Sequence, residues 1–325
     1  MNHIGLHQIK WIVSAALLGI ATHASAQSFP NRSITILVPY PPGGMIDLVA
    51  RLIQPALQKE IGQPVVIENR SGAGGNVGAE AVARAPADGY TLLLANPSLG
   101  NSAHMYAKLN YRPLQDLAYV GLYGKVPNVW LVHPAFPAQS VRDAVTVLRA
   151  APGKFNYASN GYGTSPQLSM ELMKDMTRTF VLHIPFRGSG PATASLLANE
   201  TQLMFDNLPP QVGNIKSGKL RALGVTSLKR TSVFPDLPTL DEAGIKGYEV
   251  TAWFGLAAPA ATPRDIVLRI NAALNKVTQQ PDVREQLTSR GAEVLQGTPE
   301  QFAAFVKAEH DKWGPVIKRA GIVAE

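Results

Sequence analysis

The stretch from Ile34 to Asp47 constrains the fold more than any other part of this chain. An apolar, β-branched run ends at Pro41-Pro42-Gly43-Gly44, and apolar residues then recur with helical spacing from Ile46 to Leu57. This pattern predicts a strand, a tight loop and a helix. The first amides of a helix have no partner within it, and two glycines let a ligand approach the main chain. We therefore expect an anion site, with an ordinary turn that binds nothing as the alternative.

Two residues of this loop carry further expectations. Asp47 either caps amides that would otherwise face the ligand, or holds the loop in the shape that presents them. A carboxylate this close makes a bare phosphate the poorer ligand. We also expect that a β-branched residue at Gly44 would block the amides and resist any positive φ there.

Residues 1–26 have the features of a cleaved secretory signal peptide. Lys10 precedes an apolar run from Trp11 to Ala21, and Ala24-Ser25-Ala26 is an A-x-A processing site. The run is short for a membrane span, so an N-terminal anchor helix is the weaker alternative. The chain has no cysteine, which excludes disulfides and a lipid-modified cysteine. These features predict a protein exported to the periplasm.

The charge distribution favours small anions over nucleic acid. The chain has 30 Lys and Arg against 23 Asp and Glu, and a basic surface steers anions towards a protein. However, the basic residues are scattered, without a run of five, and aromatic residues are not interleaved with them. We therefore expect an organic acid as ligand and no nucleic-acid partner.

The opening pattern repeats along the chain. A strand at 64–69, a glycine-rich loop at 71–76, a helix at about 77–85 and a strand at 90–95 follow it. Three alternations of strand and helix in sixty residues predict parallel strands with right-handed crossovers. The loops at Pro41, Ser71 and Asn96 would then meet at the carboxyl ends of the strands, where open parallel sheets bind ligands.

A second block begins after Pro127 and uses the same strand, loop and helix unit. We expect Thr164 to cap a helix and Pro191 to be the first residue of another. The region 233–250 is rich in Pro, Gly and Asp and predicts a surface return path. The predicted strands are 128–132, 155–158, 181–186, 203–205, 220–225 and 250–257, and the predicted helices are 141–150, 165–176, a short one ending near 216, 263–279 and 299–313.

No motif for a cofactor, a metal or catalysis stands out. The run from Gly72 to Gly78 lacks G-x-G-x-x-G spacing because its sixth residue is Val77, and no P-loop is present. The histidines after residue 26, namely His104, His133, His183 and His310, lack metal-ligand spacing. Ser165 and Ser189 lie in small-residue loops but not in a G-x-S-x-G elbow. We expect neither metal, cofactor nor enzymatic activity.

Short motifs distributed over the chain from residue 39 to residue 249 form a specific combination. They are Pro39-Tyr40-Pro41-Pro42-Gly43-Gly44 with Asp47, Gly62-Gln63-Pro64-Val65-Val66-Ile67-Glu68-Asn69-Arg70, Gly72-Ala73-Gly74-Gly75-Asn76, Asp88-Gly89-Tyr90-Thr91-Leu92-Leu93, Asn156-Tyr157-Ala158-Ser159, Gly188-Ser189-Gly190-Pro191, Met204-Phe205-Asp206-Asn207, Gly218-Lys219-Leu220-Arg221-Ala222-Leu223 and Gly247-Tyr248-Glu249. In this combination the chain resembles the Bug-type substrate-binding proteins of tripartite tricarboxylate transporters, the TctC-like receptors.

The resemblance implies an α/β, type II periplasmic-binding-protein fold. Two α/β domains would flank a ligand cleft, with domain 1 formed by 27–126 plus 251–325 and domain 2 by 127–250. The chain would cross between them near 125–128 and 248–254. A carboxylate would lie between the first loop and loops of domain 2, often through ordered water. The predicted ligand-binding residues are Tyr40, Pro42, Gly43, Gly44, Met45, Ile46, Asp47, Asn96, Asn160, Gly161, Gly163, Thr164, Ser165, Arg187, Gly188, Ser189 and Asp206.

This sequence departs from the family pattern in two places. Met45 and Ile46 stand where Ser and Thr are common, which predicts a drier cleft that favours an aromatic or longer aliphatic carboxylate over citrate or a short hydroxy acid. Alternatively, Ile46 packs into the core and only Met45 meets the ligand. Gln167 stands where a histidine is common, which puts any role of that histidine in doubt.

The leading function is a monomeric periplasmic receptor that captures an organic carboxylate and delivers it to membrane transporter subunits. One alternative is an exported α/β hydrolase of carboxylate esters that uses Ser165 or Ser189. The missing base and elbow argue against it. The other is a sensory co-receptor that presents its ligand to a membrane signalling protein, which the sequence does not distinguish from the transport receptor.

Overall fold

The computed structural model describes residues 29–324, and within them residues 32–324 form one compact unit. The predicted signal peptide therefore lies outside the described residues. Among the residues described, no helix is both long and apolar enough to cross a membrane.

A mixed ten-stranded sheet organises this unit, with the order β2-β1-β3-β9-β4-β7-β5-β6, while β8 and β10 also pair with β4. The strands are β1 (Ile34–Val38), β2 (Val65–Asn69), β3 (Thr91–Ala95), β4 (Leu117–Val132), β5 (Asn156–Ser159), β6 (Leu182–Pro185), β7 (Leu203–Asn207), β8 (Arg221–Val225), β9 (Thr251–Pro259) and β10 (Glu293–Val294). β1 is parallel to β2 and β3, and β5 is parallel to β6 and β7, as the alternating pattern predicts.

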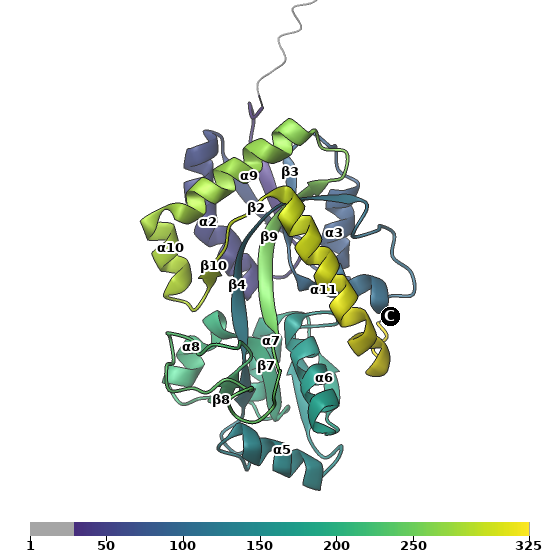
Figure 1. Cartoon of the computed structure of the whole chain (residues 1–325), viewed down its shortest axis with the longest axis vertical. Coiled ribbons are helices and arrows are strands. Elements are labelled where there is room, and N and C mark those ends of the chain that lie inside the picture. The colour runs from purple at the N-terminus through teal and green to yellow at the C-terminus, as the bar shows by residue number, and fades with distance from the viewer. Residues whose placement is uncertain (1–28, 325) are drawn as a thin grey trace, which may run out of the picture. The chain divides into compact units, whose positions relative to one another are not determined.

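The long strand β4 divides this sheet into two parts. Its residues from Leu117 to Pro127 pair with β9, and those from Asn128 to Val132 pair with β7 (Figure 1). We call the part with β1, β2, β3, β9 and β10 the first half-sheet, and the part with β5, β6, β7 and β8 the second half-sheet. Both predicted crossing segments lie where β4 passes between the halves, since Val126 pairs with Ala252 and Pro127 with Thr251.

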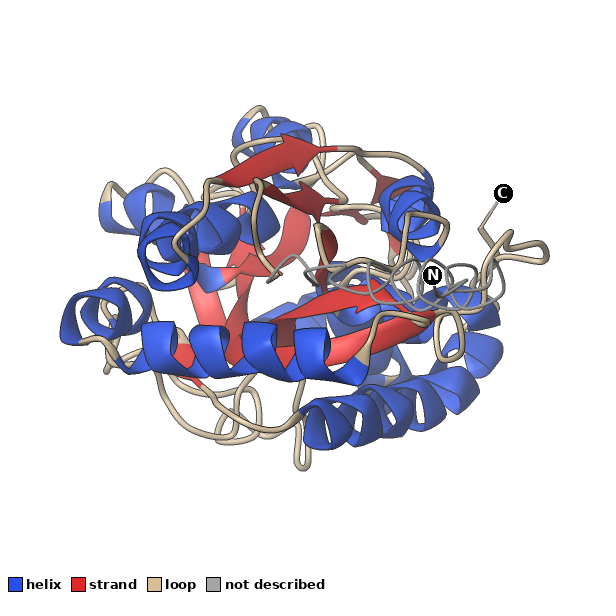
Figure 2. Cartoon of the chain, turned by 90° about the horizontal axis from the view of Figure 1, so that it is seen from above, coloured by secondary structure: helices blue, strands red, loops and turns tan. Residues whose placement is uncertain are grey.

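Helices lie on both sides of the strands (Figure 2). They are α2 (Met45–Ile61), α3 (Asn76–Ala83), α4 (Pro97–Asn101), α5 (Val141–Ala150), α6 (Ser165–Thr177), α7 (Ser189–Leu197), α8 (Leu208–Lys216), α9 (Arg264–Gln279), α10 (Pro281–Thr288) and α11 (Pro299–Arg319), with the short 3₁₀ turns η1 (Ala73–Gly75) and η2 (Ser102–His104). The helix α11 runs from the first half-sheet down beside α6 (Figure 1), and the two helices pack together.

Aromatic side chains form much of the core. In the second half-sheet Trp130 stacks on Phe205, with ring centroids 5.4 Å apart, and Phe205 faces Tyr248. In the first half-sheet Trp253 meets Phe302 edge to face. All five are buried. Burying such rings removes a large apolar area from water, which stabilises both halves.

Two local predictions are wrong, and the N-cap prediction for Thr164 is confirmed in position only. The segment 233–250 carries no helix or strand, but Leu240 and Tyr248 within it are fully buried, so it is no mere surface path. Pro191 is the third residue of α7, which begins at Ser189. Thr164 occupies the N-cap position of α6, but its hydroxyl donates to the carbonyl of Gly161 (2.7 Å) and caps no amide.

Candidate functional site

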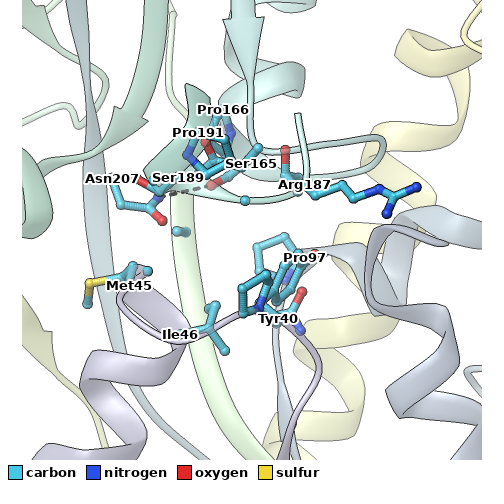
Figure 3. Close-up of a pocket in the computed structure, with 18 of the residues that line it drawn as sticks. Tyr40, Met45, Ile46, Pro97, Ser165, Pro166, Arg187, Ser189, Pro191 and Asn207 are labelled. Carbon is cyan, nitrogen blue, oxygen red and sulfur yellow. Dashed lines mark hydrogen bonds between the residues drawn. The ribbon is translucent and has the colours of Figure 1, made fainter. Parts of the chain in front are cut away.

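A pocket lies between the two half-sheets, at the ends of strands that lead into helices (Figure 3). The loop after β1 and the turn after β3 form one wall. The loops after β5 and β6 and the end of β7 form the other. Ala252 of β9 also lines it. The strand–loop–helix units of the two sequence blocks therefore converge on one site.

Twelve of the predicted site residues line this pocket. They are Tyr40, Pro42, Gly44, Met45, Ile46, Asn96, Asn160, Thr164, Ser165, Arg187, Gly188 and Ser189. Sequence reasoning missed seven others, namely Pro41, Pro97, Pro166, Gly190, Pro191, Asn207 and Ala252. Most of these sit beside a predicted residue, so the loop motifs themselves were the available signal.

Five predicted residues do not line the pocket. Gly43, Asp47, Gly161, Gly163 and Asp206 are absent from its lining. Gly161 and Gly163 have positive φ and shape the loop before α6. The amide of Gly161 donates to Ser159 Oγ, and the amide of Gly163 donates to Gln167 Oε1. Gln167 thus holds this loop in place.

Asp47 explains the conformation of the first loop. Its carboxylate accepts hydrogen bonds from the amide of Gly43 (3.0 Å), from Arg51 Nε and from Asn69 Nδ2. Burial tends to raise the pKa of Asp47, but these three donors lower it below its ordinary value. Of the two alternatives left by the sequence, Asp47 therefore holds the loop in shape.

The first turn of α2 presents unpaired donors to the pocket. Within the described part of the chain, the amides of Met45 and Ile46 donate to no protein group, whereas the next turn begins with Leu48 donating to Gly44. The positive φ of this loop lies at Gly43 (+91°), whereas Gly44 is extended with φ −82°. Gly44 is thus an open position on the pocket wall.

A buried carboxylate organises the opposite wall. Asp206 is fully buried and accepts four hydrogen bonds, from Ser189 Oγ (2.5 Å), Gln211 Nε2 (2.6 Å), Asn160 Nδ2 (2.8 Å) and the amide of Asn207 (2.8 Å). Burial raises its pKa, and these four donors oppose that rise. Ser189, Asn160 and Asn207 all line the pocket, so Asp206 acts on it through them.

A second polar cluster supports the same wall. Asn207 Nδ2 donates to Asn128 Oδ1 (2.5 Å) and to Ser165 Oγ (3.2 Å). Asn128 in turn donates to Ser169 Oγ (2.8 Å). Asn128 lies on β4 where this strand enters the second half-sheet, so the crossing strand and the pocket share one hydrogen-bond network.

The lining carries a single formal charge. Arg187 is the one charged residue among the residues listed above as lining the pocket, and its exposed guanidinium makes no ion pair with any described residue. Its side chain extends away from Met45 and Ile46 in Figure 3. The pocket thus joins backbone donors to an available cation, which suits an anionic ligand.

Apolar side chains form much of the remaining lining, beside the asparagine, serine and threonine side chains of the walls. Met45 and Ile46 lie opposite the serines of the other wall, and five prolines complete the surface (Figure 3). Met45 is 4% exposed, whereas Ile46 is partly exposed, so the alternative in which Ile46 packs into the core is wrong.

The serines proposed for the hydrolase alternative have no catalytic partner. Ser165 Oγ contacts Asn128 and Asn207, and Ser189 Oγ donates to Asp206. One serine–histidine contact does occur, between Ser159 Oγ and His183 Nε2 (2.6 Å), but Ser159 is fully buried and does not line the pocket. No group of three or more potential metal ligands occurs among residues 29–324.

Comparisons with known proteins point in one direction. Residues 49–322 match the model of the tripartite tricarboxylate transporter family receptor. The chain is 40% identical over 323 residues to a protein from the tcbD-tcbE intergenic region of Pseudomonas sp. strain P51, covering 98% of this chain and 95% of that one. It is 36% identical over 308 residues to the protein BugT of Bordetella pertussis, covering 94% of each.

Solved structures extend this similarity to the fold. The chain matches a Rhodopseudomonas palustris protein solved with adipate at a TM-score of 0.87 and 36% identity, covering 91% of this chain and 99% of that one. It matches the periplasmic binding protein BugD at 0.86 and 34%, covering 91% and 100%. It matches the malate-bound MatC of R. palustris at 0.84 and 35%, covering 89% and 100%.

Proposed function

The chain belongs to the tripartite tricarboxylate transporter receptor family, and from this we propose that it captures an organic carboxylate in the periplasm and delivers it to a membrane transporter of that type. Its mixed α/β fold is that of a type II periplasmic binding protein. The observation that carries the proposal is the pocket itself, in which unpaired amides at the start of α2 face a cleft whose one charged residue is Arg187.

The relatives indicate the class of ligand. Adipate and malate, bound by two similar proteins, are both dicarboxylates. We infer that one carboxylate of the ligand bonds to the free amides and that Arg187 attracts a second one. The apolar contribution of Met45, Ile46 and the prolines favours a longer aliphatic or an aromatic body, because burying apolar surface gains about 25 cal/mol per Å².

The proposal extends to the architecture and the mode of action. Residues 27–126 with 251–325 would form one domain and 127–250 the other, and the protein would act as a monomer. A hydrolase is disfavoured because the pocket serines contact amide and carboxylate groups rather than a histidine. BugD, to which this chain is similar, is a periplasmic binding protein.

Calorimetry with adipate, terephthalate, malate and citrate tests the ligand class. We expect adipate or terephthalate to bind more tightly than citrate, and Met45→Ser to narrow that difference. Arg187→Gln should weaken dicarboxylate binding by roughly two- to fivefold, because an exposed ion pair contributes about 1 kcal/mol or less. Arg142→Gln, on the exposed side of α5, is the matched control. Tighter binding of citrate than of every other acid would overturn the predicted selectivity, and no binding of any acid would overturn the receptor proposal.

A further inference from the structure

The hydrogen-bonding direction of the Asp206 wall carries information about the ligand. A serine hydroxyl has one hydrogen to donate and two lone pairs that accept. Ser189 donates its hydrogen to Asp206 Oδ2 at 2.5 Å. Only its lone pairs therefore remain for a molecule in the pocket, so Ser189 presents an acceptor.

The two asparagines of this wall, Asn160 and Asn207, also direct their side-chain nitrogens towards protein groups. Asn160 Nδ2 donates to Asp206 Oδ1, which leaves the Asn160 carbonyl oxygen buried and without a hydrogen-bond partner among the described residues. Asn207 uses its side-chain nitrogen on Asn128 and Ser165. Its carbonyl oxygen therefore also remains an acceptor, and its carboxamide lies across the pocket from Met45 and Ile46 in Figure 3.

Asp206 imposes this direction. Three of its four partners, Gln211, Asn160 and the amide of Asn207, contact it through N–H groups that can only donate. Four donors fill the lone-pair positions of an ionised carboxylate, so the hydroxyl of Ser189 is also turned inwards. The buried carboxylate of Asp206 thus has a function beside a pocket for anions. It accepts hydrogens from the neighbouring side chains, so that these side chains present acceptor oxygens.

The donors of the pocket, by contrast, are main-chain amides and the guanidinium of Arg187. The amides of Met45 and Ile46 have no protein partner in the described structure and suit a carboxylate. A ligand that bears only carboxylates would satisfy these amides but leave the acceptors of the other wall unpaired, which is unfavourable in a closed site.

We propose that the ligand is a carboxylate that also carries a hydrogen-bond donor, a hydroxyl group near the carboxylate, which bonds to Ser189 Oγ and to the Asn207 carbonyl oxygen. This rests on the proposed function and deepens it, since the apolar wall contacts the carbon skeleton while the Asp206 wall recognises the donor. Asp206 is a positioning residue in this scheme, and Ser189 is a specificity-determining one.

Matched pairs of acids that differ by one hydroxyl group test this. The pairs are adipate and 2-hydroxyadipate, adipate and 3-hydroxyadipate, and phenylacetate and mandelate. Calorimetry on the wild type should show at least one hydroxylated acid binding roughly tenfold more tightly than its partner, because a site built around a hydroxyl group rejects the analogue that lacks it. Equal affinities in every pair would mean that water supplies the donor and would overturn the inference while the receptor function stands. No binding of any acid would overturn both.

Two variants separate recognition from folding. Ser189→Ala should reduce the affinity for the preferred hydroxy acid by about tenfold and leave that for its unsubstituted partner unchanged. Asp206→Asn lets the new amide donate to Ser189, whose hydrogen then points into the pocket. The ratio of the affinities for the hydroxylated acid and its unsubstituted partner should therefore fall towards one. Asp236→Asn, an exposed acid, is the control and should retain the preference. If Ser189→Ala and Asp206→Asn weakened both members of the pair equally, their role would be structural and the inference would be wrong.

Discussion

Adjacent glycines in the first loop differ in what they require. Gly43 has a φ of +91°, a conformation that residues with a Cβ adopt only with strain, while Gly44 is extended and a Cβ there would meet nothing within 4 Å. Gly43 also donates its amide to Asp47. The conformation of the loop therefore depends on Gly43, whereas Gly44 leaves space in the pocket next to the loop.

We predict that Gly43→Ala lowers stability by about 1–3 kcal/mol and weakens carboxylate binding, because the loop must move to relieve the strain. Gly44→Ala should change stability by less than about 0.5 kcal/mol. Urea unfolding and calorimetry on both variants measure this. Equal losses of stability and affinity in the two variants would contradict the prediction that the positive φ of Gly43 matters more than the open position of Gly44.

A second single residue, His183, makes the free energy of unfolding depend on pH. Its ring stacks on Tyr157, and burial, together with the nearby charge of Lys174, lowers its pKa from 6.5 to about 4. The unfolded chain thus takes up a proton between pH 6.5 and 4 that the folded chain does not. Stability contributed by this neutral histidine is full above pH 6.5 and falls as the pH drops towards 4, by about 3 kcal/mol in total.

We expect His183→Gln to flatten the dependence of unfolding free energy on pH between 6.5 and 4, even if the variant is less stable throughout. His133→Gln provides the control, because the His133 ring accepts a hydrogen bond from the nearby amide of Ala135 and is not part of the stack of His183 on Tyr157. Urea unfolding series at several pH values give the slopes. An unchanged slope in His183→Gln would contradict the prediction.

At the scale of elements, α11 connects the two half-sheets. It packs on α4 and β4 of the first half and on α6 of the second. Trp313 and Ile317, in its last turns, belong to the same buried cluster as Met170 and Met173 of α6. The C-terminal helix thus contributes its apolar face to a core far from it in sequence.

Ile317→Ala should cost about 2–5 kcal/mol of unfolding free energy, because the side chain is fully buried and its removal leaves a cavity. Val323→Ala, at a position 68% exposed, should cost less than about 0.5 kcal/mol. Urea midpoints at constant m-value give both numbers. A loss below 1 kcal/mol for Ile317→Ala would show that α11 adds little to this core.

At the scale of the whole unit, loops of the two half-sheets touch beside the pocket. Asn101 of α4 donates to the carbonyl of Gly163 (3.2 Å), and a Cβ on Gly188 would lie 3.5 Å from Pro41. These contacts connect the walls directly, while β4 and β9 connect them through the chain. An entering ligand therefore requires the loops to separate.

Ligand binding should reduce the radius of gyration, because the ligand-free protein opens about β4 and β9 and the bound protein returns to the arrangement described here. Small-angle X-ray scattering with and without a saturating acid measures the change, and glucose at the same concentration should have no effect. Identical profiles with and without acid would indicate a rigid, preformed site.

The sequence alone determined the elements and the loops that form the site. Hydrophobic periodicity and the Pro/Gly clusters predict β1, α2, β5 and α5 closely, because these signals act over a few neighbouring residues. The long first part of β4, with α4 and α10, was not predicted, because the residues 117–126 become a strand only by pairing with β9, more than a hundred residues away.

Only the tertiary structure decided which of the site residues face the pocket. Asp47 and Asp206 lie in site motifs, yet both are turned away from the pocket, because side-chain direction depends on partners distant in sequence, such as Asn69 for one and Asn160 for the other. The sequence specifies donors and acceptors without saying which are already paired. Folding commits the hydroxyl hydrogen of Ser189 and the side-chain N–H groups of Asn207 to partners within the protein, and this is why their oxygen lone pairs are available to a ligand.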